Sequence, residues 1–208
     1  MAAPGPLTRS NLTPDEALQL LKDGNRHYLD GTAIRPHLTG HEQRVALAQG
    51  QQPFCVLVGC SDSRVPPELL FNRGLGELFI VRNAGNVVDL AAMGSIEYAV
   101  ALLGAPLIVV LGHERCGAVQ AAVDVVDHDA TYPGSIGQMI EPIIPAVLRA
   151  RRDGDHDLLD RSMRGNVARI VERLRNTEQM LIEPQKSGRL KIVGARYDLD
   201  DGNVDFFE

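Results

Sequence analysis

Two cysteines and a histidine follow two apolar segments of this 208-residue chain, in positions where they could bind one metal ion together. Cys60 comes directly after an apolar run that ends in Gly59. His113 and Cys116 follow a second apolar run that ends in Gly112. Thiolate and imidazole are ligands that zinc prefers, and a catalytic zinc site uses three protein ligands and leaves one position open. The three residues therefore predict a catalytic zinc site, whereas a structural zinc finger would normally show a second Cys-x-x-Cys pair.

Each of these residues taken singly has a simpler interpretation, because cysteine is among the residue types most often buried in protein cores. The placement of all three at the ends of predicted strands, flanked by glycines, favours the metal site. Cys55 provides the contrast, since it lies inside an apolar run, and we interpret it as structural.

Asp62 and Arg64 lie two residues apart in the segment that begins at Cys60. A carboxylate and a guanidinium at this spacing can pair bidentately, although an ordinary surface ion pair of this kind contributes little to stability. Beside a zinc ion the carboxylate has two alternative roles. Asp62 accepts a hydrogen bond from zinc-bound water or hydroxide, or it binds zinc itself as a fourth ligand and closes the site.

Secondary-structure elements must bring these residues together, and three apolar runs rich in β-branched residues are candidates for such elements. Residues 54–58, 78–81 and 107–111 predict parallel strands buried on both faces. Between the second and third strands, Asp89 is an N-cap and Gly104 a stop signal for a helix, which completes a βαβ unit. Binding sites in open α/β sheets form at the carboxyl ends of the strands, where both metal-ligating segments fall.

The rest of the chain predicts mostly helices. Thr13, Pro14 and Glu16 form a capping-box start for a helix that runs to about Tyr28. Further expected elements are helices at 41–49 and 118–126, a loop at 127–137, a proline-interrupted helix at 136–151, an amphipathic helix at 159–174, and strands at 190–195 and 204–207 joined by a turn at 201–202.

The predicted fold class is α/β, with a mostly parallel β-sheet flanked by helices on both faces, an antiparallel C-terminal edge strand and an N-terminal helical arm. We expect a single domain over residues 1–208, in which residues 1–50 form the arm and residues 51–208 form the sheet core with the zinc site. A chain of this length fits one domain.

The composition indicates which classes of binding partner and which cellular compartment to expect. The net charge of −6, with scattered Lys and Arg, gives no basic patch for nucleic acid. Residues 1–10 lack the apolar segment of a secretory signal, and the apolar runs are too short to span a membrane. Three cysteines argue against a disulfide framework. We therefore expect a cytoplasmic protein without nucleic-acid or membrane partners.

The motifs together resemble those of the β-class carbonic anhydrases, over about residues 15–207. The most specific matching segments are 60–64, 81–86, 96–99 and 113–117. The resemblance implies a zinc lyase that reversibly hydrates carbon dioxide to bicarbonate and a proton by a zinc-bound hydroxide. It also implies that Asp62 and Arg64 form the catalytic dyad, and that a homodimer is the minimal unit, with a tetramer as the larger alternative.

The resemblance also implies a substrate pocket made of Gln51, Phe79, Ala84, Tyr98 and the Gly117 amide. In the family the Gln, Phe and Tyr come from the neighbouring subunit, so we expect the two subunits of a dimer to complete each other's sites. Interpreted without the resemblance, Phe79 and Tyr98 would be core residues and Gln51 a solvated loop residue.

One subgroup of the family has a Trp three residues before the first zinc cysteine, together with a closed, bicarbonate-regulated site. This chain has Leu57 at that position and contains no Trp. Together with Gln51, this difference favours the subgroup whose zinc keeps its water. Two thiolates and a neutral imidazole cancel the charge of Zn²⁺, so the metal is a weaker Lewis acid than one held by three histidines, and we expect activity to rise with pH above neutrality.

Two alternative functions use the same residues. Relatives with this zinc site hydrolyse carbon disulfide or carbonyl sulfide, which needs the same nucleophile. A non-enzymatic alternative is a structural or regulatory zinc protein, or a thiol redox module. The presence of Asp62 beside the ligands favours an enzyme over this second alternative.

Overall fold

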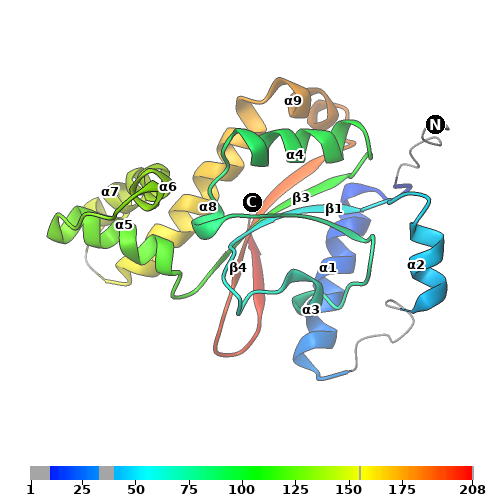
Figure 1. Ribbon diagram of the computed structural model, residues 1–208, viewed down its shortest axis with the longest axis horizontal. Helices are drawn as coiled ribbons and strands as arrows, with labels where there is room; N and C mark the ends of the chain where they lie inside the picture. Colours follow the sequence, from blue (N-terminus) through cyan, green and yellow to red (C-terminus); the bar gives the residue numbers. More distant parts are fainter. Residues whose placement is uncertain (1–9, 33–39, 155, 208) are drawn as a thin grey trace.

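Five strands form one mixed sheet in the computed structural model, which describes residues 10–32, 40–154 and 156–207 (Figure 1). The strand order is β2-β1-β3-β4-β5. The first four of these are parallel, and β5 pairs antiparallel with β4. The strands are β1 (Cys55–Gly59), β2 (Leu78–Arg82), β3 (Leu107–His113), β4 (Lys191–Tyr197) and β5 (Val204–Phe207). The predicted sheet, including its C-terminal edge strand, is confirmed.

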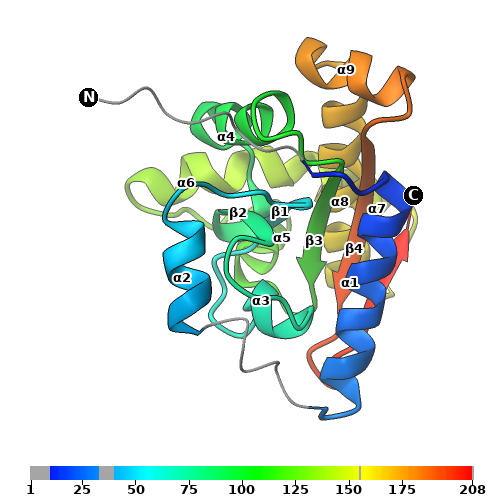
Figure 2. The same ribbon diagram turned by 90° about the vertical axis from the view of Figure 1, so that its right-hand side faces the viewer.

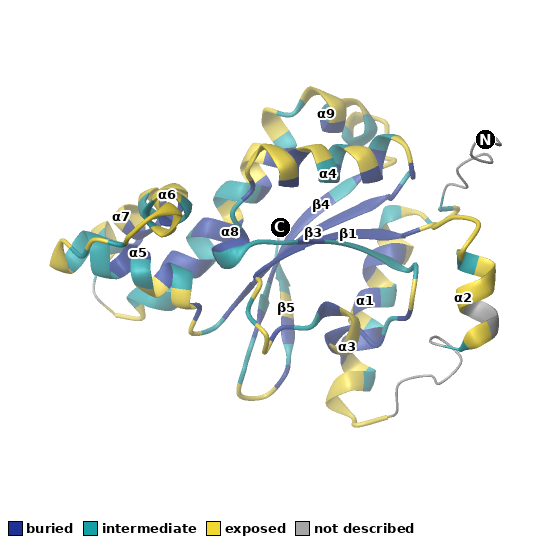
Figure 3. Ribbon diagram, viewed as in Figure 1, coloured by how far each residue is buried: buried dark blue, intermediate teal, exposed yellow. Residues whose placement is uncertain are grey.

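Helices cover both faces of this sheet (Figures 1 and 3). They are α1 (Pro14–Leu29), α2 (His41–Leu47), α3 (Pro67–Leu70), α4 (Leu90–Ala101), α5 (Gly117–His128), α6 (Ser135–Ile140), α7 (Ile144–Arg152), α8 (Leu158–Asn176) and α9 (Gln179–Lys186), with 3₁₀ turns η2 (Ala84–Asn86) and η3 (Glu141–Ile143). Helices α4, α5, α7, α8 and α9 contribute to the core on one face, and α1 and α3 to the core on the other. The turned view shows α1 beside β3 and β4 (Figure 2).

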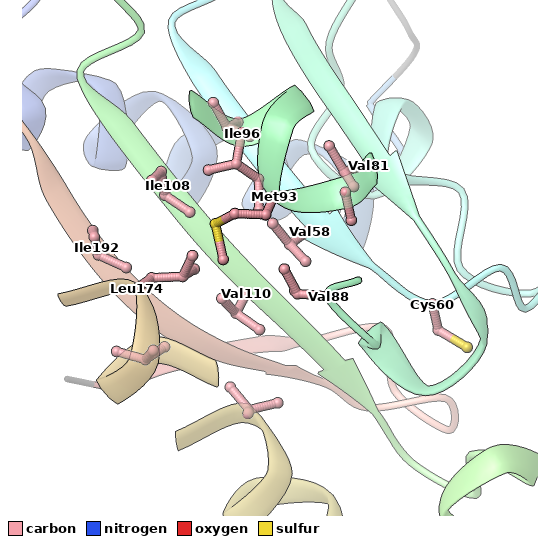
Figure 4. Packing of buried hydrophobic residues seen from close by; sticks show 14 of the residues in the cluster. Val58, Cys60, Val81, Val88, Met93, Ile96, Ile108, Val110, Leu174 and Ile192 are labelled. Atoms are coloured by element: carbon pink, nitrogen blue, oxygen red, sulfur yellow. The ribbon is translucent and has the colours of Figure 1, made fainter. Parts of the chain in front are cut away.

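The two cores follow from the alternation of side chains along each strand. All five residues of β1 are buried. Val56 and Val58 point to the face that α4 and α8 cover, whereas Cys55 and Leu57 point to the face that α1 covers. Figure 4 shows Val58 beside Met93 of α4, with Cys60 at the far end of the strand. A strand buried on both faces is expected to be continuously apolar, as the sequence of β1 is.

The predicted helix starts are confirmed by their caps. Thr13 Oγ1 accepts a hydrogen bond from the Glu16 amide at 3.3 Å, and the Glu16 carboxylate accepts one from the Thr13 amide at 2.8 Å. Asp89 caps α4 by accepting a hydrogen bond from the Ala92 amide at 2.8 Å. The sequence therefore placed the beginnings of α1 and α4 correctly.

Some helices differ from the predictions. The loop expected at 127–137 is shorter, because α5 continues to His128 and α6 already begins at Ser135. Helix α2 ends at Leu47, two residues early. Helix α9 was not predicted, since Pro184 inside it masks the helical pattern. No helix within the described ranges is long and apolar enough to cross a bilayer. Of residues 1–10, for which no secretory signal was expected, residues 1–9 lie outside those ranges.

Candidate metal centre

The three predicted ligands meet at the carboxyl-end edge of the sheet. Cys60 directly follows β1, His113 is the last residue of β3, and Cys116 is the N-cap of α5. Their ligand atoms all lie within 4.8 Å of one another, and all three residues are buried. The convergence follows from the pairing of β1 and β3 as parallel neighbours. One detail differs from the prediction, since β3 extends two residues further and includes His113.

His113 is oriented by a hydrogen bond from its own turn. Its Nδ1 lies 2.8 Å from the carbonyl oxygen of Glu114, which can only accept, so Nδ1 carries the proton. The other nitrogen, Nε2, is buried and has no hydrogen-bond partner in the described part of the chain. Buried polar atoms normally have a partner, and metal-ligating histidines normally donate their second N–H to a carbonyl or carboxylate. Nε2 is therefore the nitrogen available to a metal.

The two cysteine sulfurs lie 3.9 Å apart and are not joined in a disulfide. A hydrogen bond from the Cys116 side chain is the main reason that the pKa of Cys60 is lowered. The same contact, together with burial, raises the pKa of Cys116. Both sulfurs would have to be thiolates to hold Zn²⁺, so the proton between them would be lost when the metal binds. Two thiolates and one imidazole form a donor set that zinc commonly takes.

Asp62 is held firmly by Arg64 beside this cluster. The backbone amide and Nε of Arg64 donate to Asp62 Oδ1 at 2.9 and 3.0 Å, and Nη2 donates to Oδ2 at 2.8 Å. The pKa of Asp62 is lowered to about 2, chiefly by these hydrogen bonds. Asp62 Oδ2 lies 3.9 Å from His113 Nε2. The carboxylate thus borders the ligand set while its oxygens are engaged by Arg64.

The end of β2 and the turn that follows it support the predicted ligands through contacts that the sequence did not reveal. Arg82 Nε donates to the carbonyl of Cys60 at 2.8 Å, and its Nη2 donates to the carbonyl of Asp62 at 2.6 Å. Asn86 is buried and donates from Nδ2 to the carbonyls of Val58 and Leu111, near the ends of β1 and β3. The available signal was the pair of polar residues Arg82 and Asn86 within five residues of the end of the predicted strand 78–81, at the same edge of the sheet as the predicted ligands.

Ala84 and Gly117 lie at the site because they adjoin residues that contact it. Ala84 precedes Gly85, whose amide donates to Cys60 Sγ at 3.3 Å. Gly117 follows Cys116 and begins α5, so its amide belongs to the first turn of a 12-residue helix. Amides at a helix N-terminus favour negative charge.

Phe79, Tyr98 and Gln51 lie away from the three predicted metal ligands. Phe79 pairs in register with Val56, four residues before Cys60, which corresponds to about 13 Å along the strand. The rings of Phe79 and Tyr98 lie 6.3 Å apart. Tyr98 is 43% exposed, and Gln51 is exposed and precedes the start of β1. These three residues therefore sit toward the opposite end of β1 and are partly open to a second molecule.

Comparison with known proteins gives one consistent answer. Residues 55–204 match the family model described as carbonic anhydrase. Carbonic anhydrase 2 of Mycobacterium tuberculosis is 44% identical over 195 residues, with 93% of each chain covered. A carbonic anhydrase of Mycolicibacterium smegmatis is 40% identical, with 94% of each chain covered. The solved β-carbonic anhydrase CcaA has a TM-score of 0.72 at 25% identity, covering 93% of both chains. A tetrameric β-carbonic anhydrase of Sordaria macrospora has a TM-score of 0.72 at 24% identity, covering 92% of this chain and 97% of that one.

Proposed function

This chain belongs to the carbonic anhydrase family and has the β-class fold, and on that premise we propose that it reversibly hydrates carbon dioxide to bicarbonate and a proton at a zinc ion held by Cys60, His113 and Cys116. The observation that carries the proposal is the buried Cys-His-Cys cluster, in which His113 Nε2 has no hydrogen-bond partner among the described residues. A zinc ion held there supplies the Lewis acidity that activates water, an effect for which carbonic anhydrase is the standard example.

Asp62 and Arg64 act as a fixed acceptor beside the metal. Because the pKa of Asp62 is about 2, its carboxylate stays ionised at neutral pH and accepts a hydrogen bond from the attacking water, which orients that water. Arg64 engages both carboxylate oxygens and keeps Asp62 from turning toward the metal. This pairing supports the open form of the site over the form in which Asp62 is a fourth ligand.

The substrate-facing groups divide between two subunits in this proposal. Ala84 offers an apolar surface beside Cys60, and the Gly117 amide meets the negative charge that develops on bicarbonate. Gln51, Phe79 and Tyr98 serve the site of a second copy, because they lie too far along the sheet to reach their own. The proposal thus makes a homodimer the smallest active unit.

The decisive test measures zinc content and carbon dioxide hydration together on wild type and Asp62→Ala. We expect Asp62→Ala to keep its zinc and to lose hydration activity by about ten- to a hundredfold, the usual effect of removing a residue that supports a metal site. Asp205→Ala, which removes an exposed carboxylate on β5, is the matched control and should change neither quantity. Loss of zinc from Asp62→Ala would instead make Asp62 a ligand. Zinc-loaded wild type without hydration activity would overturn the proposal.

A second test uses the charge of the donor set. Because two thiolates and an imidazole neutralise Zn²⁺, we expect the hydration rate of wild type to rise with pH above neutrality. A stopped-flow rate profile that stays flat from mildly acidic to basic pH would contradict this part of the proposal.

A further inference from the structure

Asn166 is a buried polar residue of α8 that lies behind the metal centre. Asn166 is only 5% exposed, and its Nδ2 donates a hydrogen bond to the carbonyl oxygen of Gly85 at 2.9 Å. Asparagine is a poor helix former, and burying an amide is costly unless it forms hydrogen bonds. The hydrogen bond joins positions 81 residues apart in the chain. Such a contact restrains the backbone of Gly85.

Gly85 in turn contacts a metal ligand. Its amide donates to Cys60 Sγ at 3.3 Å, while its carbonyl receives the Asn166 hydrogen bond. Gly85 has φ +65° and ψ 22°, a left-handed conformation that favours glycine. A Cβ at this position would lie 2.6 Å from Ile143 Cδ1 and 2.9 Å from Ala118 Cβ. The direction of the Gly85 amide therefore depends on a backbone conformation held by tight packing on one side and by Asn166 on the other.

We propose that Asn166 is a positioning residue of the metal centre, which holds Gly85 so that its amide donates to the Cys60 thiolate. The inference rests on the proposed role of Cys60 as a zinc ligand. An N–H···S hydrogen bond withdraws electron density from a thiolate, which lowers its tendency to take up a proton and leaves the bound metal more electrophilic. Partners of this kind, one step removed from the ligands, tune both metal affinity and metal chemistry.

A surface cavity of about 350 Å³ beside Asn166 leaves room for substitutions at that position, and a second asparagine in its lining offers a control. Its lining includes Asn166 and Asn176, both on α8. Asn176 is the last residue of the helix and is exposed. The substitution Asn176→Asp makes the same chemical change on the same helix at a position outside the path from Asn166 to Cys60.

In the test, Co²⁺ is bound in place of zinc to wild type and to each variant, and the sulfur-to-cobalt charge-transfer band is recorded. Asn166→Asp keeps the shape of the side chain but removes the donor and places a carboxylate against the Gly85 carbonyl. We expect the band to move to longer wavelength, because the sulfur regains electron density, and zinc release to a chelator to become about ten- to a hundredfold faster. Asn176→Asp should match wild type in both measurements. An unchanged band and release rate in folded Asn166→Asp would overturn the inference.

A double variant tests whether Asn166 acts through Gly85. Gly85→Ala is expected to disturb the amide directly, through the contacts with Ile143 and Ala118. If Asn166 works by this path, Asn166→Asp combined with Gly85→Ala releases zinc no faster than Gly85→Ala alone, whereas independent effects multiply and would overturn the inference. Asn166→Ser, smaller and uncharged, replaces Asn166→Asp if the carboxylate prevents folding. Failure of wild type to bind Co²⁺ would refute the proposed metal site itself, which separates the two conclusions.

Discussion

At the scale of single residues, the chain contains cysteines in two different environments. Cys60 and Cys116 lie 3.9 Å apart beside His113, whereas Cys55 is enclosed in β1, where burial raises the pKa of its thiol. We expect Cys116→Ser to lose nearly all bound zinc. We expect Cys55→Ser to keep its zinc while its free energy of unfolding falls by roughly 1–3 kcal/mol, because the hydroxyl enters an apolar core.

Metal analysis and urea unfolding of the two serine variants check this expectation. The variants carry the same substitution within one chain, so each serves as the control for the other. Full zinc content in Cys116→Ser, or zinc loss from well-folded Cys55→Ser, would contradict the assignment of ligands.

The Asp62–Arg64 pair predicts a pH dependence of stability. The folded-state pKa of Asp62, about 2, lies below its ordinary value of 3.8, so folding favours the ionised carboxylate. The resulting stabilisation is present above about pH 4 and is lost as the pH falls toward 2. We expect metal-free wild type to exceed metal-free Asp62→Asn in free energy of unfolding near neutrality, and the difference to shrink below about pH 4.

Urea unfolding of both proteins at several pH values measures that difference. Comparing the two proteins removes the contributions of Asp160, Asp198 and Asp200, whose pKa values are also lowered by their arginine partners or hydrogen bonds. A difference that stays constant down to about pH 2 would show that the ionised Asp62 is not specifically stabilised by the fold.

The cluster of Cys60, His113 and Cys116 could be predicted from the sequence, because it depends on residue type and on position at strand ends. Asp62 and Arg64 could be paired because they lie two residues apart. The role of Asn166 could not be predicted, since its contact with Gly85 spans 81 residues and depends on how α8 packs against the sheet. Arg82 follows a predicted strand, which indicated the edge of the sheet where it lies, but its partners are the backbone carbonyls of Cys60 and Asp62, which residue types cannot identify.

At the scale of elements, the position of His113 depends on how closely α8 approaches β3. A Cβ added to Gly112 would overlap Met163 Sδ and lie 2.7 Å from Val167 Cγ2, both on α8. We expect Gly112→Ala to lower the free energy of unfolding by about 1–3 kcal/mol, the usual cost of overpacking a core. Because His113 is the next residue, zinc binding should weaken as well.

Gly165→Ala is the matched control on the facing helix. Gly165 lies in the interior of α8, and a Cβ added there would make ordinary contacts of 3.6–4.0 Å with Ala146. Alanine at such a position is expected to stabilise by about 0.5–1 kcal/mol. Thermal unfolding and zinc titration of the two variants measure both effects. A Gly112→Ala variant as stable as wild type would show that α8 can yield without cost.

Elements were predictable where local signals and burial agree. The capping box of α1 and the Asp89 cap of α4 gave correct helix starts, and β1 was evident because both of its faces are buried. The end of β3 was placed two residues early, since Gly112 and His113 carry no apolar signal even though both are buried in the sheet. Helix α9 was missed because Pro184, a residue normally unfavourable inside a helix, lies within it.

At the scale of the whole molecule, one face of α4 presents apolar side chains to the outside. Leu90 is 90% exposed, Tyr98 43% and Leu102, which caps the helix, 48%. The adjacent strand β2 lies at an edge of the sheet, and the exposed Tyr98 ring lies 6.3 Å from the ring of Phe79, in a tilted arrangement. Apolar patches of this kind are typical of protein–protein interfaces. Sequence periodicity alone would place Tyr98 in the core, because an interface and a core carry the same apolar pattern.

Subunit complementation tests whether each site is completed by a second copy. Cys60→Ser removes a zinc ligand but leaves Tyr98 intact, whereas Tyr98→Ala leaves the zinc ligands intact but removes the side chain proposed for the neighbouring site. We expect each variant alone to be nearly inactive. Mixed under conditions that allow subunits to exchange, they should regain hydration activity, because each mixed dimer contains one complete site.

Adding charge to the apolar face of α4 provides the control for this experiment. The double variant Leu90→Glu, Leu102→Glu should contain more monomer than wild type in sedimentation, because the cost of burying two carboxylates opposes association. It should retain its zinc and lose its hydration activity. Leu148→Glu, at an exposed apolar position on α7, should leave association and activity unchanged. Full hydration activity in a monomeric Leu90→Glu, Leu102→Glu variant would show that one chain builds its site alone, and absence of recovered activity in the exchanged mixture would show that Tyr98 does not act across subunits.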